Sequence, residues 1–398
     1  MRLDPTRNGP AMTTSELSTA SELPTSLRET LPGRWYTDPA IFAAEQALVF
    51  EAGWFCAVLA ADIATPGDFE TVEVGRESVI VARGRDGAVH ASLNVCRHRG
   101  ARLCTVEKGS VRRSFQCPYH AWTYALDGSL VTAPNIAHMP DVDRAAFGLH
   151  RVAVREWLGY VWLCLADEPP SFEDTVVADV TARLGSPDAI VGYQVADLAL
   201  GRRITYDVAA NWKQIVENFM ECYHCGTIHP ELTEVLPEFA DGLAAQYFVG
   251  HGAQFGDAVE GFTVDGSAGL ARLPGIGADQ DRRYYAITVR PQVFVNLVPD
   301  HVVFHRMFPV APDRTIVRCD WLYLPEVVAS GADLDRSVEL FDRVNRQDFA
   351  ACERCQLSMA SRSYARGGVL VPSEHHIGEF HDWVRSALVS TKCGYDDI

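Results

Sequence analysis

Alternating apolar and polar positions are the clearest pattern in the first half of this chain. Runs such as FETVEVG, ESVIVARG and AVHASLN have the period of two that places successive side chains on opposite faces of a strand. Asp86-Gly87 and Asp127-Gly128 fall between such runs and are typical of tight hairpin turns. The pattern predicts a small all-β domain over residues 51–166.

The N-terminal region has two other patterns. Residues 1–30 are rich in Ser, Thr and Glu without an apolar period, which predicts a disordered tail. The following run TDPAIFAAEQALVFEAGW offers Thr37 or Asp38 as a cap, Pro39 in the first turn and apolar residues at helical spacing. A helix is therefore expected within residues 31–50, packed on the C-terminal part of the chain.

Helix and strand patterns are mixed over residues 167–398. Strand-like runs such as RRITYDVA and TIVRCDWLYL accompany a helix that begins near Asn211 and a long helix from about Asp333 to Ala360. Residues 256–281 carry six glycines and little periodicity, which fits either a mobile lid or a surface loop. The chain is expected to be an α+β protein whose second domain is an antiparallel sheet with helices.

Composition and charge narrow the classes of function. The 398 residues are 47% hydrophobic, enough for two cores, and the formal net charge of −17 without a basic stripe argues against a nucleic-acid partner. No apolar run approaches the ~20 residues of a membrane span, and the N-terminus lacks the pattern of a secretory signal. A cytoplasmic protein is expected, with its eleven cysteines as reduced thiols or metal ligands rather than a disulfide framework.

One metal-binding pattern lies inside the predicted β domain. Cys96-x-His98 is followed, after eighteen intervening residues, by Cys117-x-x-His120. Two short loops would each present one thiolate and one imidazole, a set that can hold either iron or zinc. Cys104 lies between the two pairs, but its spacing fits neither, and it is expected to be a buried thiol.

A second candidate site lies in the run ENFMECYHCGTIHPEL. On a helix that starts near Asn211, the side chains of Glu217, Glu221 and His224 would share one face. His229 follows five residues after His224 and would point about 140° away on an unbroken helix. A bend at the glycine between the two histidines is therefore expected to bring both imidazoles to one ion.

Two histidines alone are more often structural than metal-binding, so a third ligand is needed. The long C-terminal helix offers Asp348, followed by Glu353 and Gln356, in the run NRQDFAACERCQ. Two imidazoles and one carboxylate on one face of a ferrous ion leave positions open for O2 and a substrate. The sequence therefore makes oxygen activation a possible chemistry.

The combination of these motifs resembles the α subunit of the Rieske non-haem iron oxygenases, over nearly the whole chain from about residue 30. The resemblance implies a Rieske 2Fe–2S domain followed by a helix-grip catalytic domain with a mononuclear non-haem Fe(II). It implies cluster ligation by Cys96 and Cys117 on one iron and His98 and His120 on the other. It further implies that His224, His229 and Asp348 bind the mononuclear iron.

Glu221 stands where many members of this family carry an aspartate that links the two metal centres across a subunit boundary. By that resemblance it would accept hydrogen bonds from an imidazole of each centre. Glutamate here resembles the branch that acts on quaternary ammonium compounds, namely the choline, glycine betaine, carnitine and stachydrine oxygenases. Hydroxylation or demethylation of an aromatic or alicyclic acid is the alternative, and an electron carrier without oxygenase activity or a zinc-stabilised binding module are the other classes.

The expected partners follow from the same resemblance. It implies a head-to-tail homotrimer in which the cluster of one subunit serves the iron of the next. The chain has no glycine-rich nucleotide fingerprint and no flavin motif. A separate flavin/ferredoxin-type NAD(P)H reductase is therefore expected to supply electrons for the reaction of O2 with a small-molecule substrate.

The remaining cysteines and aromatic residues have no function assigned by their spacing. The pairs Cys222/Cys225 and Cys352/Cys355 are expected to be packing thiols. Several residues beside the cluster motif are expected to shield it from water: Pro118, Tyr119 and Trp122. Several aromatic residues are candidates for a cation-binding pocket, with core packing as the simpler role: Phe219, Tyr284, Tyr285, Phe294 and Phe304.

Overall fold

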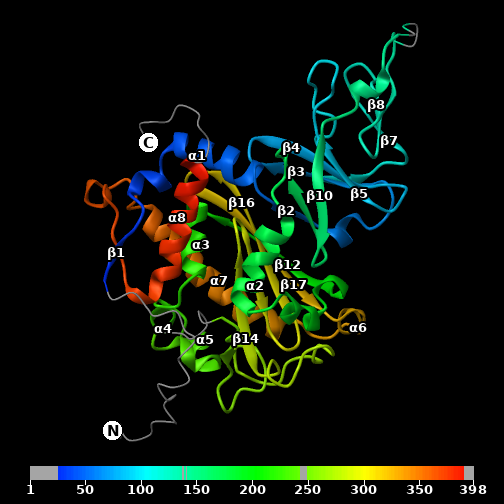
Figure 1. Ribbon diagram of the computed structural model, residues 1–398. Coiled ribbons are helices and arrows are strands. Elements are labelled where there is room, and N and C mark those ends of the chain that lie inside the picture. Colours follow the sequence, from blue (N-terminus) through cyan, green and yellow to red (C-terminus); the bar gives the residue numbers. More distant parts are fainter. Residues whose placement is uncertain (1–25, 137–138, 140, 243–248, 390–398) are drawn as a thin grey trace, which may run out of the picture.

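The structure is a computed structural model that describes residues 26–136, 139, 141–242 and 249–389. Figure 1 shows two sheet-based parts, one built from the first half of the chain and one from the second half. Within the described ranges, no helix is both long and apolar enough to cross a membrane.

The first part contains an antiparallel seven-stranded sheet and a three-stranded sheet, as the alternation predicts. In sheet order, the seven strands are β2 (Phe55–Leu59), β11 (Tyr160–Cys164), β10 (Arg151–Trp157), β5 (Val89–Leu93), β4 (Glu77–Arg83), β3 (Asp68–Val74) and β6 (Lys108–Ser110). The smaller sheet consists of β7 (Ser114–Gln116), β8 (Thr123–Ala125) and β9 (Leu130–Thr132).

Both predicted Asp-Gly turns are confirmed. Gly87 and Gly128 each have a φ of +82°, a conformation that glycine adopts without steric cost. The preceding aspartates fix the turns, because Asp86 Oδ1 accepts a hydrogen bond from the Ala88 amide and Asp127 Oδ1 accepts one from the Ser129 amide.

The second part is built on a six-stranded antiparallel sheet that curls around a long helix. The strands, in sheet order, are β12 (Ala199–Val208), β17 (Arg314–Tyr323), β16 (Val302–Ala311), β15 (Val293–Leu297), β14 (Arg283–Val289) and β13 (Ala253–Gln254). The helices are α2 (Ala178–Leu184), α3 (Trp212–Phe219), α4 (Cys225–Ile228), α5 (Pro230–Val235), α6 (Pro325–Ala329), α7 (Asp335–Gln356) and α8 (His375–Val389). The expected α+β class is confirmed.

Helix α7 is the predicted long helix and lies against this sheet (Figure 1). Its buried side includes Val338, Phe341, Val344 and Asp348, which the helical period places along one stripe. Asn345 also faces the sheet, where its Oδ1 atom lies 3.1 Å from His305 Nε2 on β16. The helix therefore presents Asp348 to the interior of the second part.

The N-terminal helix forms as predicted, but the ordered chain begins earlier than expected. In α1 (Pro39–Glu45), the Asp38 side chain caps the helix by accepting a hydrogen bond from the Ala40 amide. Glu45 then forms a buried ion pair of 2.6 Å with Lys213 of α3, which anchors the helix on the second part. Within the expected tail, β1 (Arg28–Glu29) pairs with β18 (Val369–Leu370), while residues 1–25 lie outside the described ranges.

A buried ion network joins the two parts of the molecule. Tyr160 of β11 donates a hydrogen bond of 3.0 Å to Asp320 of β17, which also pairs with Arg203 and Arg306. Burial would raise the pKa of Asp320, but the two guanidinium groups outweigh it and hold that pKa below its usual value. Because Arg306 also donates to the Ala57 carbonyl on β2, the network fixes one sheet on the other.

The glycine-rich segment 256–281 is packed onto the second part. Its Phe262 side chain is 1% exposed and stacks on the ring of Tyr284, with centroids 5.4 Å apart. Phe262 also contacts Phe341 of α7, at 5.6 Å between centroids. The segment therefore supports two residues that line the site described below.

Candidate metal centres

The helix that leads into the histidine motif ends earlier than predicted. Helix α3 begins where expected, with Asn211 as its cap, but it stops at Phe219. Glu221 provides the physical reason, because its carboxylate accepts hydrogen bonds from the backbone amides of Tyr223 and His224 and so replaces helical acceptors. The prediction that Glu217, Glu221 and His224 share one helical face is wrong.

Glu217 points away from the histidine motif. Its Oε1 atom accepts hydrogen bonds from the Tyr36 hydroxyl at 2.8 Å and lies 3.0 Å from His381 Nε2. Glu217 therefore joins α3 to the N-terminal segment and α8, which is a structural role.

The predicted bend at Gly226 is also misplaced. Gly226 lies inside α4, where a Cβ atom would stand 2.4 Å from the Ala240 carbonyl oxygen, so the glycine permits a close backbone approach. The chain leaves the helix at His229, with φ −121° and ψ 62°, because the following Pro230 disfavours the helical conformation in the residue before it. This departure turns the His229 side chain toward His224.

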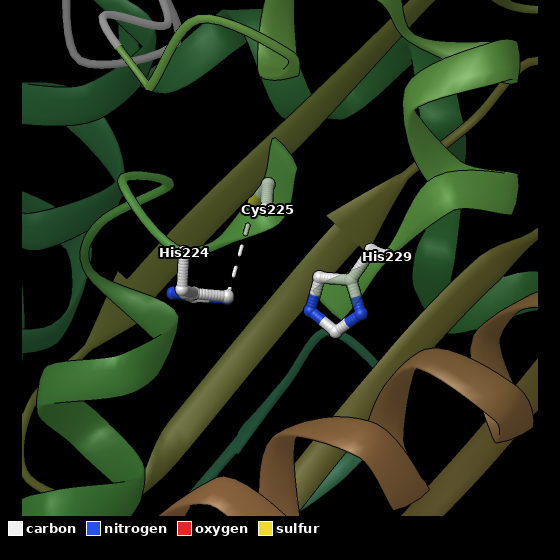
Figure 2. A group of neighbouring side chains, drawn as sticks. All are labelled: His224, Cys225 and His229. Atoms are coloured by element: carbon white, nitrogen blue, oxygen red, sulfur yellow. Dashed lines mark hydrogen bonds between the residues drawn. The ribbon is translucent and has the colours of Figure 1, made fainter. Parts of the chain in front are cut away.

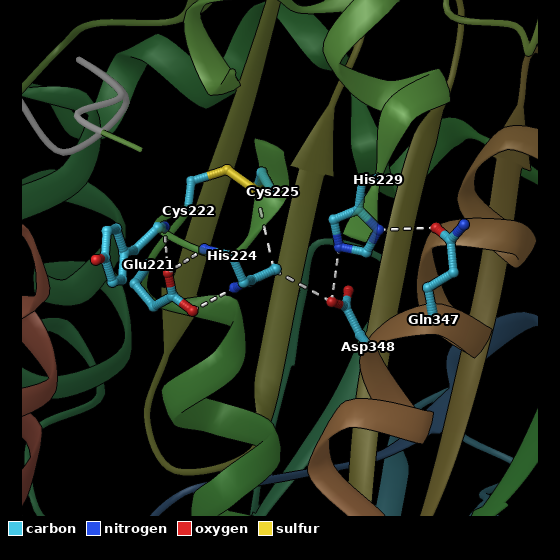
Figure 3. The surroundings of a disulfide bond; sticks show 8 residues. Glu221, Cys222, His224, Cys225, His229, Gln347 and Asp348 are labelled. Atoms are coloured by element: carbon cyan, nitrogen blue, oxygen red, sulfur yellow. Dashed lines mark hydrogen bonds and ion pairs between the residues drawn. A yellow bond between two sulfur atoms is a disulfide. The ribbon is translucent and has the colours of Figure 1, made fainter. Parts of the chain in front are cut away.

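The structure brings His224, His229 and Asp348 together (Figure 3). Asp348 Oδ1 lies 2.8 Å from His229 Nε2 and 3.2 Å from His224 Nε2. Ligand atoms that lie ~2.1 Å from one ion and at right angles to each other would be about 3.0 Å apart. The separations and the chemistry of this donor set therefore fit a single divalent ion.

The charges at this site compensate each other. Burial lowers the pKa of His224, but hydrogen bonds to Asp348 and Glu221 outweigh it and raise that pKa to about 10. Burial likewise raises the pKa of Asp348, and the two imidazoles outweigh it, so that this pKa lies below its usual value. The two imidazoles therefore offset the charge of the buried Asp348 carboxylate.

Each histidine is oriented by a second hydrogen bond. Glu221 Oε1 lies in close contact with His224 Nδ1, and Gln347 Oε1 lies 2.8 Å from His229 Nδ1. Both contacts direct the Nε2 atoms toward Asp348, as partners of metal-binding histidines generally do. The sequence did not predict this role of Gln347, since only its position next to Asp348 indicates it.

Glu353 and Gln356 hold the helix that carries Asp348. Glu353 Oε1 accepts a hydrogen bond from the Ala209 amide, and Gln356 Oε1 accepts one from the Asn211 amide, each at 3.0 Å. These contacts tie the end of α7 to the start of α3. Their role is therefore to set the distance between Asp348 and the histidine motif.

Cys222 and Cys225 form a disulfide, so the prediction that they are free packing thiols is wrong. Their Cα atoms lie 5.0 Å apart because the chain turns between α3 and α4, and this separation is typical of disulfides. The other eight cysteines of the described ranges are free, as expected for reduced thiols. Of the second pair, Cys352 is buried and Cys355 is exposed.

Two neighbouring cavities adjoin the histidine motif. The one at the motif has a volume of about 40 Å³, and its aromatic lining residues are Phe219, Phe239, Tyr284 and Phe341. The other has a volume of about 240 Å³ and shares Phe219 and Ala286 with the first. Three of the aromatic candidates from the sequence are not among the lining residues of either cavity: Tyr285, Phe294 and Phe304.

The two Cys/His pairs of the first motif form two neighbouring loops. Cys96 and Cys117 are each 2% exposed and free. The rings of His98 and His120 lie side by side, with centroids 4.5 Å apart, and His98 stacks flat on Trp122 at 5.2 Å. The two loops therefore present two buried thiols and two imidazoles that are less buried than the thiols.

These loops fit an iron–sulfur cluster in their donor atoms. Among the described residues, the buried Nδ1 atom of His120 has no hydrogen-bond partner, which leaves it available to an iron. The Tyr124 hydroxyl, not found from the sequence, lies 3.4 Å from Cys96 Sγ and 3.0 Å from the Arg97 amide nitrogen. Hydrogen bonds to cluster sulfurs tune the potential of such a cluster.

The expected shield of the cluster loops is only partly present. Trp122 is 7% exposed, whereas Tyr119 is 57% exposed although its ring lies 3.8 Å from that of His120. Pro118 is also exposed. Cys104 is buried and free, as expected, and burial raises the pKa of its thiol to about 11.

The two candidate centres are far apart within one chain. Figure 1 places β7 and β8, which flank Cys117 and His120, at the opposite end of the molecule from α4.

Comparisons with protein families match both parts. Residues 53–144 match the Rieske [2Fe-2S] domain, and residues 195–390 match the ring hydroxylating alpha subunit (catalytic domain). The glycine betaine monooxygenase oxygenase subunit of Pseudomonas aeruginosa is 31% identical, over 90% of this chain and 89% of its own. The carnitine monooxygenase oxygenase subunit of Escherichia coli is 30% identical, over 89% of this chain and 92% of its own.

Solved structures match the whole described fold. The quaternary ammonium Rieske monooxygenase CntA in complex with γ-butyrobetaine gives a TM-score of 0.69 at 26% identity, over 91% of this chain and 96% of its own. Naphthalene 1,2-dioxygenase from Rhodococcus gives 0.72 at 21% identity, over 91% and 95% of the two chains, which is a likeness of fold alone.

Proposed function

This chain belongs to the Rieske non-haem iron oxygenases as an oxygenase α subunit, and on that premise we propose that it oxidises a quaternary ammonium compound at a carbon bonded to the nitrogen. As a Rieske oxygenase component, the protein uses O2 and electrons from a separate reductase. Where the oxidised carbon is an N-methyl group, the hydroxylated product breaks into an amine and formaldehyde. One oxygen atom of O2 then leaves in the formaldehyde and the other in water.

We propose that the mononuclear iron is held by His224, His229 and Asp348. The proposed cluster ligands are Cys96, His98, Cys117 and His120. When bound, the cluster carries single electrons and the mononuclear iron activates O2 beside the substrate. The protein itself orients the two histidines through Glu221 and Gln347 and excludes water by the aromatic walls of the cavity.

The aromatic lining of the smaller cavity is the observation that carries the substrate class. Phe219, Phe239, Tyr284 and Phe341 line this cavity together with the proposed iron ligands, and none of the described lining residues is a lysine or arginine. Aromatic rings attract a methylated ammonium group, and no cation among these lining residues would repel it. A cavity of about 40 Å³ also suits a compact group better than a fused ring system.

The larger cavity is suited to the rest of such a substrate. Arg183 and Arg290 lie in its wall together with Asp179 and Glu379, so charges of both signs are present. The relatives named above act on glycine betaine and carnitine, as their names state. We propose that a carboxylate of a betaine lies on this side of Phe219 while the ammonium group lies on the iron side.

We further propose a homotrimer in which the cluster of one subunit serves the iron of the next. Three observations support it. The two centres lie at opposite ends of one chain (Figure 1), Glu221 contacts His224, and the solved structure of a quaternary ammonium Rieske monooxygenase gives insights into inter-subunit electron transfer in that protein. A flavin/ferredoxin-type NAD(P)H reductase and a cytoplasmic location complete the proposal.

The substrate class is tested by turnover with a surrogate reductase. Choline, glycine betaine, carnitine and γ-butyrobetaine are compared with benzoate-type acids, and formaldehyde, hydroxylated product and O2 consumption are measured. We expect coupled product formation with at least one ammonium compound and none with its neutral isostere, in which carbon replaces nitrogen. Turnover restricted to aromatic acids would refute the proposed substrate class.

A further inference from the structure

We propose that the Cys222–Cys225 pair decides which ligands the mononuclear site presents to a metal. When the pair forms a disulfide, its sulfur atoms do not bind the metal, and the available ligands are the two imidazoles and Asp348. As two thiols, it adds Cys225 as a fourth ligand that favours zinc over iron. This inference rests on the iron ligands proposed above.

The position of Cys225 carries the inference. Its Sγ atom lies 3.9 Å from His224 Nε2, and ligand atoms of His224, Cys225 and His229 all lie within 4.8 Å of one another (Figure 2). In a tetrahedral site with metal–sulfur and metal–nitrogen distances of ~2.3 and ~2.1 Å, these two atoms would be about 3.6 Å apart. The separation of Cys225 Sγ from His224 Nε2 is therefore close to that of two ligands of one zinc ion.

Helix α4 places Cys225 close to His229 in the chain and in space. Cys225 is the first residue of α4 and precedes His229 by one helical turn, with the His229 amide donating to the Cys225 carbonyl at 3.0 Å. Cys222 lies in the turn before α4 and is not part of the group of neighbouring ligand atoms, which belongs to His224, Cys225 and His229.

The chemistry of sulfur makes the two states different. A disulfide sulfur carries no thiolate charge and is a poor metal ligand, whereas a thiolate is a preferred ligand of zinc. A site with two imidazoles, a thiolate and a carboxylate is closed and four-coordinate, while the set without sulfur leaves positions open. The disulfide therefore protects the open site from capture by zinc.

The change of state is a two-electron step. A dithiol reductant breaks the Cys222–Cys225 bond, becomes a disulfide itself and passes two electrons and two protons to the pair. Metal binding then displaces the proton of Cys225. Hydrogen peroxide closes the pair again, taking up the two electrons and two protons to give two molecules of water.

Four samples with matched variants test the inference: oxidised wild type, wild type reduced by a phosphine, Cys222→Ser and Cys225→Ser. Each protein keeps its cluster, whose visible spectrum reports folding, and is freed of mononuclear iron by chelation. Cobalt(II) is added, and difference spectra are recorded for the sulfur-to-cobalt charge-transfer band. Zinc affinity is measured by competition with a chromophoric chelator.

We expect the sulfur band, and zinc affinity at least about tenfold higher, in the reduced wild type and Cys222→Ser only. Cys225→Ser and oxidised wild type should bind cobalt without the band. The inference would be overturned if Cys222→Ser bound cobalt without the sulfur band. It would also be overturned if the oxidised wild type showed that band. Absence of cobalt from all four proteins would instead refute the three-ligand site on which the inference depends.

Discussion

His229 Nε2 lies 2.8 Å from Asp348 Oδ1, although the two residues are 119 positions apart in the chain. The contact depends on the non-helical backbone conformation of His229. It also depends on the position of α7, the helix that carries Asp348. The His229 backbone and helix α7 therefore both have to be placed accurately if these residues are to bind the proposed iron.

Gln347 should determine how tightly this ion is held. Gln347→Leu removes the acceptor of the His229 Nδ1 hydrogen and should weaken iron affinity by about 10- to 100-fold, with the cluster intact. Iron content and a chelator competition measure the effect. Gln347→Glu keeps an acceptor and should restore most of the affinity; equal loss in both variants would contradict a positioning role.

Tyr284 should recognise the positive charge of the substrate. Tyr284→Leu removes a ring worth about 1–2 kcal/mol to a cation and should raise KM for an ammonium substrate by about 5- to 30-fold, with a smaller change in kcat. The matched control is Tyr285→Leu, since neighbouring residues of β14 face opposite sides of the sheet. An equal rise in both variants would show that packing alone is responsible.

Tyr124 should raise the reduction potential of the cluster. Its hydroxyl lies 3.4 Å from Cys96 Sγ, and a hydrogen bond to that sulfur disperses negative charge. Tyr124→Phe should therefore lower the potential in a redox titration followed by the visible spectrum. Tyr119→Phe, which alters an exposed tyrosine beside His120, should leave the potential unchanged.

Asp320 should make the free energy of unfolding decrease at acidic pH. Its folded pKa lies below the usual value of about 4, so its stabilisation is present above that pH and is lost as the pH falls through the folded pKa. Asp320→Asn should cost about 3–5 kcal/mol near neutral pH, because Arg306 is left buried without its partner. Unfolding curves between pH 3 and pH 7 measure both effects.

The exposed pair Asp207–Arg314 on the same sheet is the control for this prediction. Asp207→Asn should change stability little at any pH, because solvent screens an exposed ion pair. A similar loss in Asp207→Asn and Asp320→Asn would contradict the role given to burial.

The sequence predicted features that depend on local period or on fixed spacing. The strands, the Asp-Gly turns and the long helix α7 follow from periods and turn residues that act over a few positions. The pairing of His98 with His120 likewise follows from two short loops. These features are local, and little in the rest of the chain opposes them.

The sequence did not predict features that depend on competition between hydrogen bonds. The residue spacing predicted a helix through Glu221. Its carboxylate instead accepts hydrogen bonds from two backbone amides, and the helix ends before it. The disulfide of Cys222 and Cys225 depends on that same turn, and the Gln347 contact depends on how α7 meets α4. Neither could be read from residue types alone.

The separation of the two metal-binding ends has a consequence for how activity depends on protein concentration. If the proposed homotrimer dissociated, a single subunit would keep both metal centres and its colour, but its cluster would have no iron of a neighbouring subunit to reduce. Dilution should therefore abolish turnover before any metal is lost. The turnover rate per subunit should rise with protein concentration until trimer formation is complete.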